Sequence, residues 1–383
     1  MTTLDEYIHR IESRSRRSPG ALVISAKLLD VARLAATSTP HALYGSVEPA
    51  DDGPIYRVQA VSADPTLDQR LGVVLMPGTT FDTSDIVLRA SDAVATQGGL
   101  PIDVVVVDES KYLDRVRGVP GADALSSKTV VVVGTGSVGS DLATRLARLG
   151  LAVHAVDPER LETENLVRWG LMVSPSSVGR RKALVWRDAV RASVPGARVE
   201  GHALNVVRDA VAFSDLLQTA RPDLVVVATD TRDSRAVVNG LAARLGFPTL
   251  YVAFSDLAAS VRIELVTDAA KGPCHLCSTY AEGGRHAPVR GSLQPYAVET
   301  APARGVPALP VNVTLGTAIA ARLALVFVSG APVDPWFSHG EQRGNLMFVT
   351  MEPETWVFEE PLDRLVVQAE RWPECPVCGG GDD

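Results

Sequence analysis

The sequence predicts a doubly wound α/β fold, in which helices cover both faces of a mostly parallel, Rossmann-like sheet. Strand-like and helix-like stretches alternate from Ser127 onward, which is the order that builds such a sheet. The run Thr129–Val133 is uninterrupted and β-branched, as expected of a parallel strand buried on both faces. A glycine-rich stretch, Gly134–Gly139, separates this strand from the next helix.

The elements after this stretch continue the alternation. Apolar residues at helical spacing predict a helix over Ser137–Leu149. We expect further strands at Val153–Val156, Leu224–Ala228, Thr249–Phe254, Leu346–Met351 and Thr355–Phe358. The segment Ser278–Pro310, rich in Gly, Pro and Ala, is expected to be a long functional loop.

One apolar run, Val311–Val328, is long enough to suggest a membrane span. It contains the polar Asn312 and Thr314, and Arg322 lies in its most apolar part. Charged residues are rare in membrane spans, so a buried core helix is the better interpretation.

Residues 1–110 differ in pattern and are expected to form a small α/β accessory domain before the main domain of residues 111–383. The predicted helices are Leu4–Ser13, Ala21–Ala36 and Ser84–Gln97, and the predicted strands are Ala42–Val47, Ile55–Val61, Leu71–Leu75 and Ile102–Val107.

The composition is that of an ordinary globular protein, with 46% hydrophobic and 21% charged residues. The formal net charge is −8 and no run of Lys and Arg occurs, so we expect no nucleic-acid partner. The first residues lack the basic and apolar regions of a secretory signal. We therefore expect a cytoplasmic protein that does not bind a membrane.

The glycine-rich stretch is a candidate phosphate site. Gly134, Gly136 and Gly139 permit a tight turn and a close approach of backbone to phosphate, and the helix that follows supplies unpaired N–H groups. Asp157 ends the next strand, where a carboxylate can accept ribose hydroxyls. Many dehydrogenases share this pattern, and a tight turn without a ligand remains the alternative.

The four cysteines fall into two pairs, Cys274 with Cys277 and Cys375 with Cys378. Two Cys-x-x-Cys pairs supply the four thiolates of a structural Zn²⁺ site. We expect His275, which lies inside the first pair, to point away from the metal.

Three further motifs follow Asp157 in the chain: Asn165-Leu-Val-Arg168, Gly179-Arg-Arg-Lys182 and Ala228-Thr-Asp230-Thr-Arg-Asp-Ser-Arg235. With them the sequence resembles the ThiF/MoeB-type adenylyltransferases of the ubiquitin-activating-enzyme-like superfamily, over roughly Lys111 to Gly380. The same order of motifs recurs in that family, and many members also have two Cys-x-x-Cys pairs.

The resemblance implies roles for the matching residues. Asp157 would hold the ribose, Asn165 and Arg168 the triphosphate, and Lys182 the phosphates from the other side. Asp230 matches the aspartate that positions Mg²⁺. Its alternative role is to cap the following helix, unless Asp233 does so.

A finger arginine that reaches the other subunit of a homodimer also belongs to the family. Arg115 is preferred for this role over Arg117, although a plain surface charge is nearly as good an interpretation. The sequence departs from the family at Ser137, where a third glycine is usual, and at Thr231, where an asparagine is usual.

The resemblance implies Mg²⁺- and ATP-dependent adenylation of a carboxylate, with release of pyrophosphate. The substrate would be the C-terminal glycine of a small ubiquitin-like or sulfur-carrier protein. All four cysteines are assigned to zinc, so no thiol remains for a thioester, and the reaction is expected to stop at the acyl-adenylate.

Three alternatives remain open. Microcin-type enzymes adenylate a short peptide and carry an N-terminal peptide clamp, a role that residues 1–110 could share. These residues also faintly resemble a degenerate JAB/MPN domain. A non-catalytic nucleotide-binding partner is favoured by Ser137 and Thr231. An NAD-dependent oxidoreductase is the weakest alternative, because it has no use for Arg168, Lys182 and Asp230.

Overall fold

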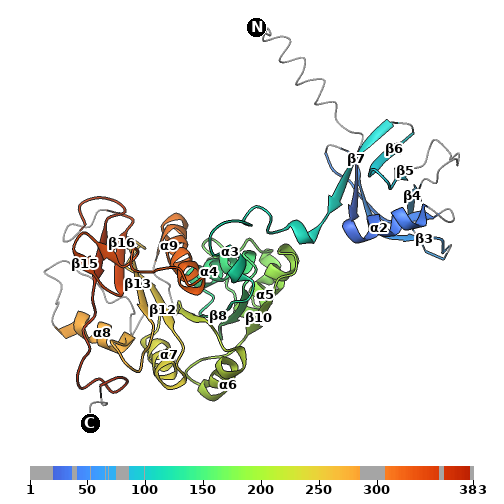
Figure 1. Cartoon of the computed structure of the whole chain (residues 1–383). Helices are drawn as coiled ribbons and strands as arrows, with labels where there is room; N and C mark the ends of the chain where they lie inside the picture. Colours follow the sequence, from blue (N-terminus) through green and yellow to red (C-terminus); the bar gives the residue numbers. More distant parts are fainter. Residues whose placement is uncertain are drawn as a thin grey trace, which may run out of the picture. The chain divides into compact units, whose positions relative to one another are not determined.

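The computed structural model describes residues 20–36, 41–51, 53–64, 66–67, 69–74, 86–98, 100–284, 307–352 and 358–379. The chain divides into two compact units, Met1–Tyr112 and Leu113–Asp383 (Figure 1). Each unit has a hydrophobic core of its own.

The first unit contains a closed barrel whose strands are hydrogen-bonded in the order β1-β3-β2-β4-β5-β6-β7. Helix α2 (Ala26–Ala35) follows the first strand directly. The strands are β1 (Ala21–Ser25), β2 (Ala42–Glu48), β3 (Ile55–Ser62), β4 (Arg70–Val74), β5 (Ile86–Arg89), β6 (Val94–Gln97) and β7 (Leu100–Val107).

One expected helix of this unit begins later than predicted. The helix expected over Ala21–Ala36 begins only at Ala26, because Ala21–Ser25 pair with β3 and β7 as a strand. Ser25 then caps the helix by accepting a hydrogen bond from Leu28 N at 3.2 Å. The helix expected over Leu4–Ser13 lies outside the described residues.

The helix predicted over Ser84–Gln97 is wrong. Ile86–Arg89 and Val94–Gln97 are the antiparallel strands β5 and β6. Ile86 and Leu88 both face the barrel core, a period of two that belongs to a strand. A turn containing Ala93 at φ +53° reverses the chain between them.

The second unit is built on an eight-stranded sheet in the order β10-β9-β8-β11-β12-β13-β16-β17. The strands are β8 (Thr129–Val133), β9 (Ala152–Val156), β10 (Val199–His202), β11 (Leu224–Val227), β12 (Thr249–Phe254), β13 (Ser260–Val266), β16 (Leu346–Thr350) and β17 (Arg364–Val367). The strands from β10 to β12 pair in parallel, whereas β13, β16 and β17 are added antiparallel. The expectation of a mostly parallel sheet is therefore confirmed in part, for the five strands from β10 to β12.

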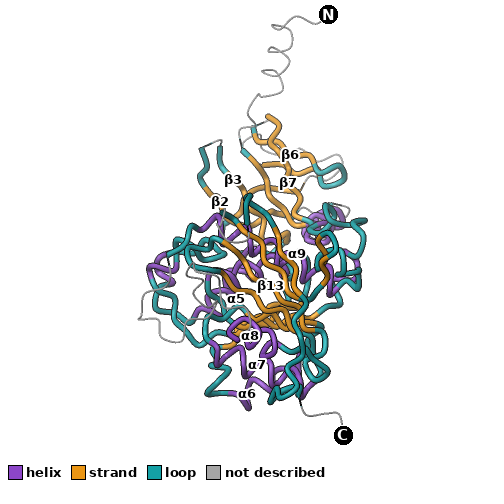
Figure 2. The backbone as a smooth tube through the Cα atoms, turned by 90° about the vertical axis from the view of Figure 1, so that its left-hand side faces the viewer, coloured by secondary structure: helices purple, strands orange, loops and turns teal. Residues whose placement is uncertain are grey.

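Helices cover both faces of this sheet, as the doubly wound pattern predicts. One core contains side chains of α4 (Ser137–Arg148), α5 (Lys182–Ser193) and α9 (Pro310–Val328). The opposite core contains those of α6 (Ala210–Ala220) and α7 (Arg232–Leu245). Figure 2 shows α6, α7 and α8 (His275–Gly284) below the orange sheet.

The remaining elements are short. They are η1 (Glu109–Lys111), α3 (Ala122–Leu125), η2 (Thr163–Asn165), η3 (Pro175–Ser177), β14 (Ser338–His339) and β15 (Gln342–Arg343). Strands β14 and β15 pair with each other as a separate two-stranded sheet.

Helix α9 has the length and composition of a membrane span, and it is the one such helix among the described residues. Half of its most apolar window is buried, with Ala320, Leu323 and Ala324 inside the core. It packs on α4, β12 and β13, as the prediction of a core helix requires.

Two other expectations change in this part of the chain. The loop expected over Ser278–Pro310 is wrong at its start, because residues up to Gly284 belong to α8. Residues 285–306 of it lie outside the described residues, as do residues 355–357 of the last predicted strand. Arg364–Val367 form the final strand of the sheet instead.

Candidate functional site

The glycine-rich turn lies at the carboxyl end of β8 and leads directly into α4. Gly134 has φ +90°, a backbone conformation that favours glycine. A Cβ on Gly139 would lie 1.8 Å from Gly134 O, so only glycine lets the helix pack against the turn. A Cβ on Gly136 would meet nothing within 4 Å. Ser137 is the first residue of α4, and no positive φ is required there.

Asp157, at the end of β9, binds the backbone of this turn. Its carboxylate is buried and accepts hydrogen bonds from Thr135 N at 2.6 Å and from Glu159 N at 2.8 Å. Burial raises the pKa of Asp157, although these two amides and the nearby charge of Lys182 act in the opposite direction. The acidic side chain therefore lies beside the glycine-rich turn, at the edge where parallel sheets bind nucleotides.

The chain after Asn165 is fixed against the same turn. Trp169 Nε1 donates to Thr135 O at 2.7 Å. Ser140 Oγ donates to Gly136 O at 2.6 Å and accepts from Gly170 N at 2.9 Å. These contacts bring the Asn165–Arg168 stretch close to the turn, and the motif alone gave no role to Trp169 or Ser140.

Lys182 begins α5 and lies next to Asp157. Its side chain is 8% exposed, and Nζ forms an ion pair with Glu159 Oε2 at 2.6 Å. The backbone carbonyl of Glu159 also accepts a hydrogen bond from Lys182 N at 2.9 Å. Asn165 ends the turn η2, where its Oδ1 accepts from Glu162 N at 3.1 Å. The buried ammonium group is thus held beside Asp157 by Glu159, which follows Asp157 by two residues.

Asp230 lies on the segment after β11, beside Gly134. The position of a Cβ on Gly134 is 3.1 Å from Thr229 Cγ2, which places this segment against the glycine-rich turn. Asp230 is exposed and precedes the N-cap residue of α7, which is Thr231. The alternative role of Asp230 as the N-cap is therefore wrong, and Asp233 lies within the first turn of the helix.

The first turn of α7 holds this segment in place. Ser234 Oγ lies 2.7 Å from Thr229 Oγ1 and 2.6 Å from Thr231 Oγ1. Arg235, for which the motif suggested no role, is buried and donates from Nε and Nη2 to Thr229 O at 2.9 and 2.7 Å. The two residues that flank Asp230 are therefore fixed, whereas its carboxylate is accessible.

Arg115 lies outside this network. It is exposed in the turns that follow η1, near the ion pair of Arg117 with Asp114 at 2.8 Å. Within the part of the chain that the structure describes, no hydrogen bond or ion pair links Arg115 to Asp157, Lys182 or Asp230.

The four cysteines come together as the sequence predicts. Their sulfur atoms all lie within 4.8 Å of one another, and all four side chains are buried. None forms a disulfide. Burial raises the pKa of Cys274, and raises that of Cys277 to about 11. Four buried sulfur donors at this spacing are a set that fits one tetrahedral metal ion, which would stabilise the thiolates.

Neighbouring groups support the cysteine cluster. Asn239 Nδ2, on α7, donates to Cys274 Sγ at 3.4 Å, and Trp372 N donates to Cys277 Sγ at 3.4 Å. A Cβ on Gly272 would lie 2.8 Å from Cys378 Sγ, so glycine is needed for the loop to pass the sulfur. Such contacts orient metal ligands.

His275 points away from the sulfurs, as expected. Its Nδ1 donates to Glu264 Oε2 at 2.6 Å, and its ring stacks on Tyr251 with the centroids 3.8 Å apart. Although burial alone would raise the pKa of Glu264, Arg262 at 3.0 Å and His275 hold it at about 2. Burial lowers the pKa of His275 to about 4, so the ring is neutral at pH 7. Sequence patterns did not reveal this ionic cluster.

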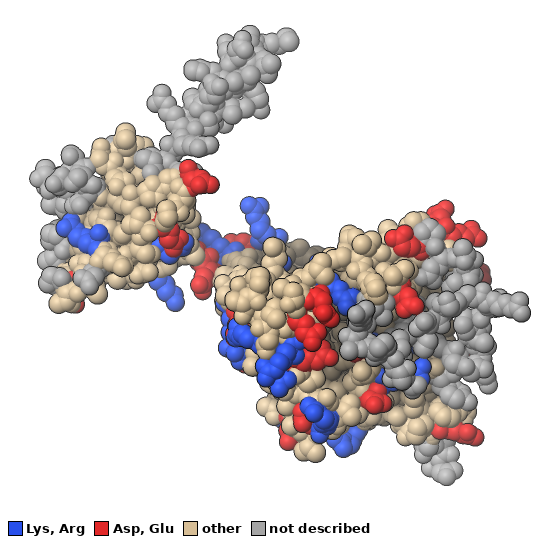
Figure 3. All heavy atoms as spheres, turned by 180° about the vertical axis from the view of Figure 1, so that it is seen from behind, with Lys and Arg blue, Asp and Glu red and all other residues tan. Residues whose placement is uncertain are grey.

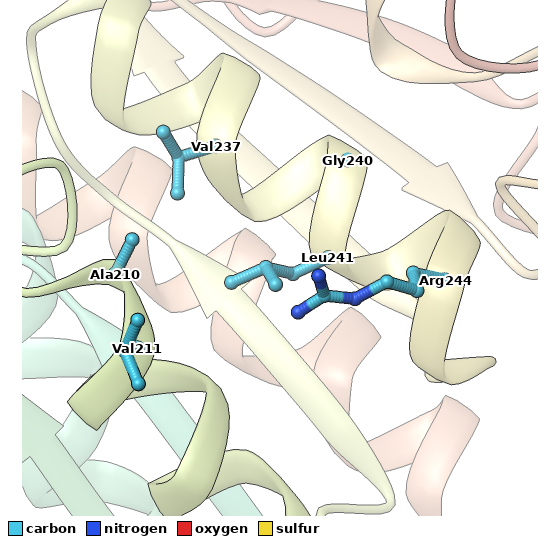
Figure 4. Close-up of a pocket in the computed structure, with 6 residues that line it drawn as sticks. All are labelled: Ala210, Val211, Val237, Gly240, Leu241 and Arg244. Atoms are coloured by element: carbon cyan, nitrogen blue, oxygen red, sulfur yellow. The ribbon is translucent and has the colours of Figure 1, made fainter.

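A shallow groove of about 270 Å³ lies between α6 and α7 (Figure 4). Ala210 and Val211 line it from α6, and Val237, Leu241 and Arg244 are among the residues that line it from α7. None of the predicted site residues lines it. On the face of the second unit seen in Figure 3, acidic and basic side chains are interspersed.

Comparison with known proteins places this site in a family. The ThiF family model matches residues 109–347. The sulfur carrier protein adenylyltransferase of Thermus thermophilus is 32% identical over 164 residues, which cover 42% of this chain and 58% of the relative. The adenylyltransferase and sulfurtransferase MOCS3-2 of Zea mays is 28% identical over 262 residues, or 64% of this chain and 52% of the relative.

Among solved structures, E. coli MccB with succinimide aligns with a TM-score of 0.48 and 20% identity, covering 68% of this chain and 69% of that one. The chain spans about half the length of the curated relatives it matches. The family match includes the glycine-rich turn, Asp157, Lys182 and Asp230. The chain belongs to the ThiF family.

Proposed function

We propose that this chain adenylates a carboxylate with Mg·ATP and releases pyrophosphate. The observation that carries the proposal is the joint placement of the glycine-rich turn, the Asp157 carboxylate and the buried Lys182 at one edge of the sheet. The curated relatives are named as adenylyltransferases.

Different residues of the site are proposed to bind the ribose and the phosphates of ATP. The turn around Gly136 offers backbone N–H groups and open space for a phosphate. Asp157 has one lone pair left on each oxygen beyond its two backbone contacts, and these can accept ribose hydroxyls. Lys182 exchanges its ion pair with Glu159 for the triphosphate, and Asn165 and Arg168 contact the same phosphates.

Asp230 is proposed to hold the Mg²⁺ that accompanies ATP. Its exposed carboxylate lies on the segment that contacts Gly134. Bound Mg²⁺ neutralises the charge that develops on the phosphoryl oxygens when the substrate carboxylate attacks the α-phosphorus. Without the ion, the aspartate would repel the triphosphate.

The departures from the family motif are compatible with an active enzyme. Ser137 has an ordinary helical backbone at the start of α4, so a third glycine is not needed for the turn. Thr231 occupies the N-cap position of α7 without a side-chain cap hydrogen bond, and its Oγ1 bonds to Ser234 Oγ. These observations weigh against the alternative of a non-catalytic nucleotide-binding partner.

The cysteines are proposed to bind one structural Zn²⁺ through Cys274, Cys277, Cys375 and Cys378. The ion would tie the loop before α8 to the C-terminal segment after β17. Because the chain has four cysteines, no thiol is left to receive the acyl group. The acyl-adenylate would then pass to an external nucleophile.

We also propose that the chain acts as a two-fold homodimer in which Arg115 reaches the active site of the partner subunit. Arg115 is exposed and lies outside the network of its own chain, as an arginine offered to another subunit must be. Its guanidinium would stabilise the charge on the transferred group.

The proposed acceptor is the C-terminal glycine of a small ubiquitin-like or sulfur-carrier protein, the class that the name of the Thermus thermophilus relative states. Exchange of labelled pyrophosphate into ATP tests this, with acceptors offered one at a time. We expect exchange with a folded protein that ends in Gly-Gly, and none with the same protein carrying a C-terminal amide.

Exchange that requires a short peptide instead would favour the microcin-type alternative. An absence of exchange with both acceptor classes would contradict the proposed reaction. In that case, tight ATP binding by the inactive protein would identify a nucleotide-binding partner.

A further inference from the structure

Arg235 is a buried cation directly beside the segment that carries Asp230. It is 5% exposed, and its Nη2 donates to Val252 O on β12 at 2.9 Å as well as to Thr229 O. Burial lowers the pKa of Arg235 to about 10, so the guanidinium is still charged at neutral pH. A buried charge destabilises the fold unless it is well bonded, and here both acceptors are backbone carbonyls.

The geometry connects this cation to the position of the Asp230 carboxylate. Thr229 O belongs to the peptide unit that leads into Asp230, and a peptide unit is planar. A guanidinium that fixes this oxygen therefore fixes the plane from which Asp230 extends. Within the described residues, the Asp230 side chain makes no hydrogen bond or ion pair of its own. Its position depends on the residues that flank it.

We propose that Arg235 is a positioning residue, which sets the place of the Asp230 carboxylate by bridging the Thr229 carbonyl to the Val252 carbonyl of the neighbouring strand. This inference rests on the proposed function in one respect, namely that Asp230 binds the Mg²⁺ that accompanies ATP. Strand β12 is the rigid reference, since its residues are buried in the sheet.

Arginine suits this bridge and lysine does not. The planar guanidinium presents several donors in a fixed geometry, and two of its nitrogens are used for Thr229 O while one also reaches Val252 O. Lysine keeps the positive charge but lacks the rigid planar fork, in which Nε and Nη2 bind Thr229 O together while Nη2 also reaches Val252 O. The substitution Arg235→Lys therefore retains the charge and removes the fixed geometry that holds the Thr229 carbonyl.

A matched control lies on the same helix. Arg244 is exposed and donates to Ser214 Oγ at 3.1 Å beside the groove between α6 and α7 (Figure 4). Arg244→Lys makes the same chemical change far along α7 from the Thr229 segment. Hydrogen exchange on the full-length protein without nucleotide should show faster exchange of the amides of residues 228–234 in Arg235→Lys only. Equal protection in the two variants would overturn the proposal.

A second experiment measures the rate of pyrophosphate exchange at increasing Mg²⁺ concentration. A displacement of about 1 Å costs around a hundredfold in rate. We therefore expect Arg235→Lys to lose about 10- to 100-fold in the exchange rate and to need more Mg²⁺ for half-maximal rate, while KM for ATP changes little. A purely structural defect would instead lower the unfolding midpoint and leave the Mg²⁺ dependence unchanged.

A double-mutant cycle with Asp230→Asn decides whether Arg235 acts through Asp230. If it does, Arg235→Lys has no further effect on the exchange rate once Asp230 has been replaced. If the double variant instead loses activity by the product of the two single losses, the proposal is contradicted. If wild-type protein catalyses no exchange, the proposed function fails, whereas the amide-exchange measurement still decides the role of Arg235.

Discussion

The glycine-rich turn provides two substitutions with opposite expected effects. In Gly139→Ala the new Cβ would lie 1.8 Å from Gly134 O, where ordinary contact begins at 3.4 Å. Because the obstacle is backbone, the helix or the turn must move. Overpacking of this kind costs typically 1–3 kcal/mol and sometimes more, so we expect a loss of about 3 kcal/mol in the free energy of unfolding.

Gly136→Ala should leave stability nearly unchanged. Its Cβ would meet nothing within 4 Å, and its φ of −68° is open to alanine. A less favourable N-cap and a stiffer unfolded chain offset each other to within about 1 kcal/mol. The methyl group would, however, occupy the space through which phosphate approaches the backbone. ATP affinity should therefore fall at least about tenfold, because the phosphate can no longer approach the backbone as closely as glycine permits.

Calorimetric titration with ATP, together with urea unfolding of both variants, measures the two effects. If the turn binds no ligand, Gly136→Ala should change neither the ATP affinity nor the free energy of unfolding. If Gly136→Ala binds ATP as the wild type does, the turn does not hold the phosphates. If Gly139→Ala is as stable as the wild type, the packing of α4 against the turn is not as described.

Four further predictions concern the metal, the thiols, the dimer and pH. Elemental analysis should find one zinc per chain, and Cys375→Ser should lose the zinc and lower the unfolding midpoint; native protein without zinc would contradict the site. No reductant-sensitive adduct between enzyme and acceptor should accumulate, and mass spectrometry that maps one to a cysteine would refute the assignment of all four to the metal. Mixing Arg115→Ala with Asp230→Ala chains should restore about a quarter of the activity, because half of the dimers are then hybrids with one complete site; a fully active monomer in sedimentation would disprove the role in trans. The stacked pair His154 and His202 is half-buried, with 3.1 Å between Nδ1 and Nε2, and burial lowers both pKa values. Stability should therefore be complete above the unfolded pKa near 6.5 and decrease as pH falls below it, and His202→Gln should reduce this decrease; an unchanged pH dependence of urea unfolding would refute it.

The parallel half of the second unit could be predicted from the sequence because its signals are local. The β-branched run Thr129–Val133 and the glycines after it define a strand, a turn and a helix without reference to the rest of the chain. The prediction for the first unit was wrong where its strands are short. Ile86–Arg89 is a strand because β4 and β6 pair with it. A segment of four residues is too short for its own sequence pattern to reveal these pairings.

The site shows the same division. Two cysteine pairs and a sequence of motifs identified the sulfur cluster and the residues beside the turn, because spacing carries that information. Arg235 and Glu264 were missed because charged residues usually lie at the surface, and only tertiary packing buries them. One signal was present: Glu264 stands next to Ile263 and Leu265 in an apolar run, which is unusual for a solvated charge.

The fate of the carboxylate oxygen tests the central claim most directly. An acceptor whose C-terminal carboxylate carries a heavy oxygen isotope is incubated with the enzyme, Mg·ATP and an external amine or thiol, and the nucleotide product is analysed by mass spectrometry. Adenylation joins a carboxylate oxygen to the α-phosphorus, so the AMP released on transfer should contain the heavy isotope, with unlabelled pyrophosphate beside it. Formation of ADP and phosphate, or AMP without the label, would contradict the account.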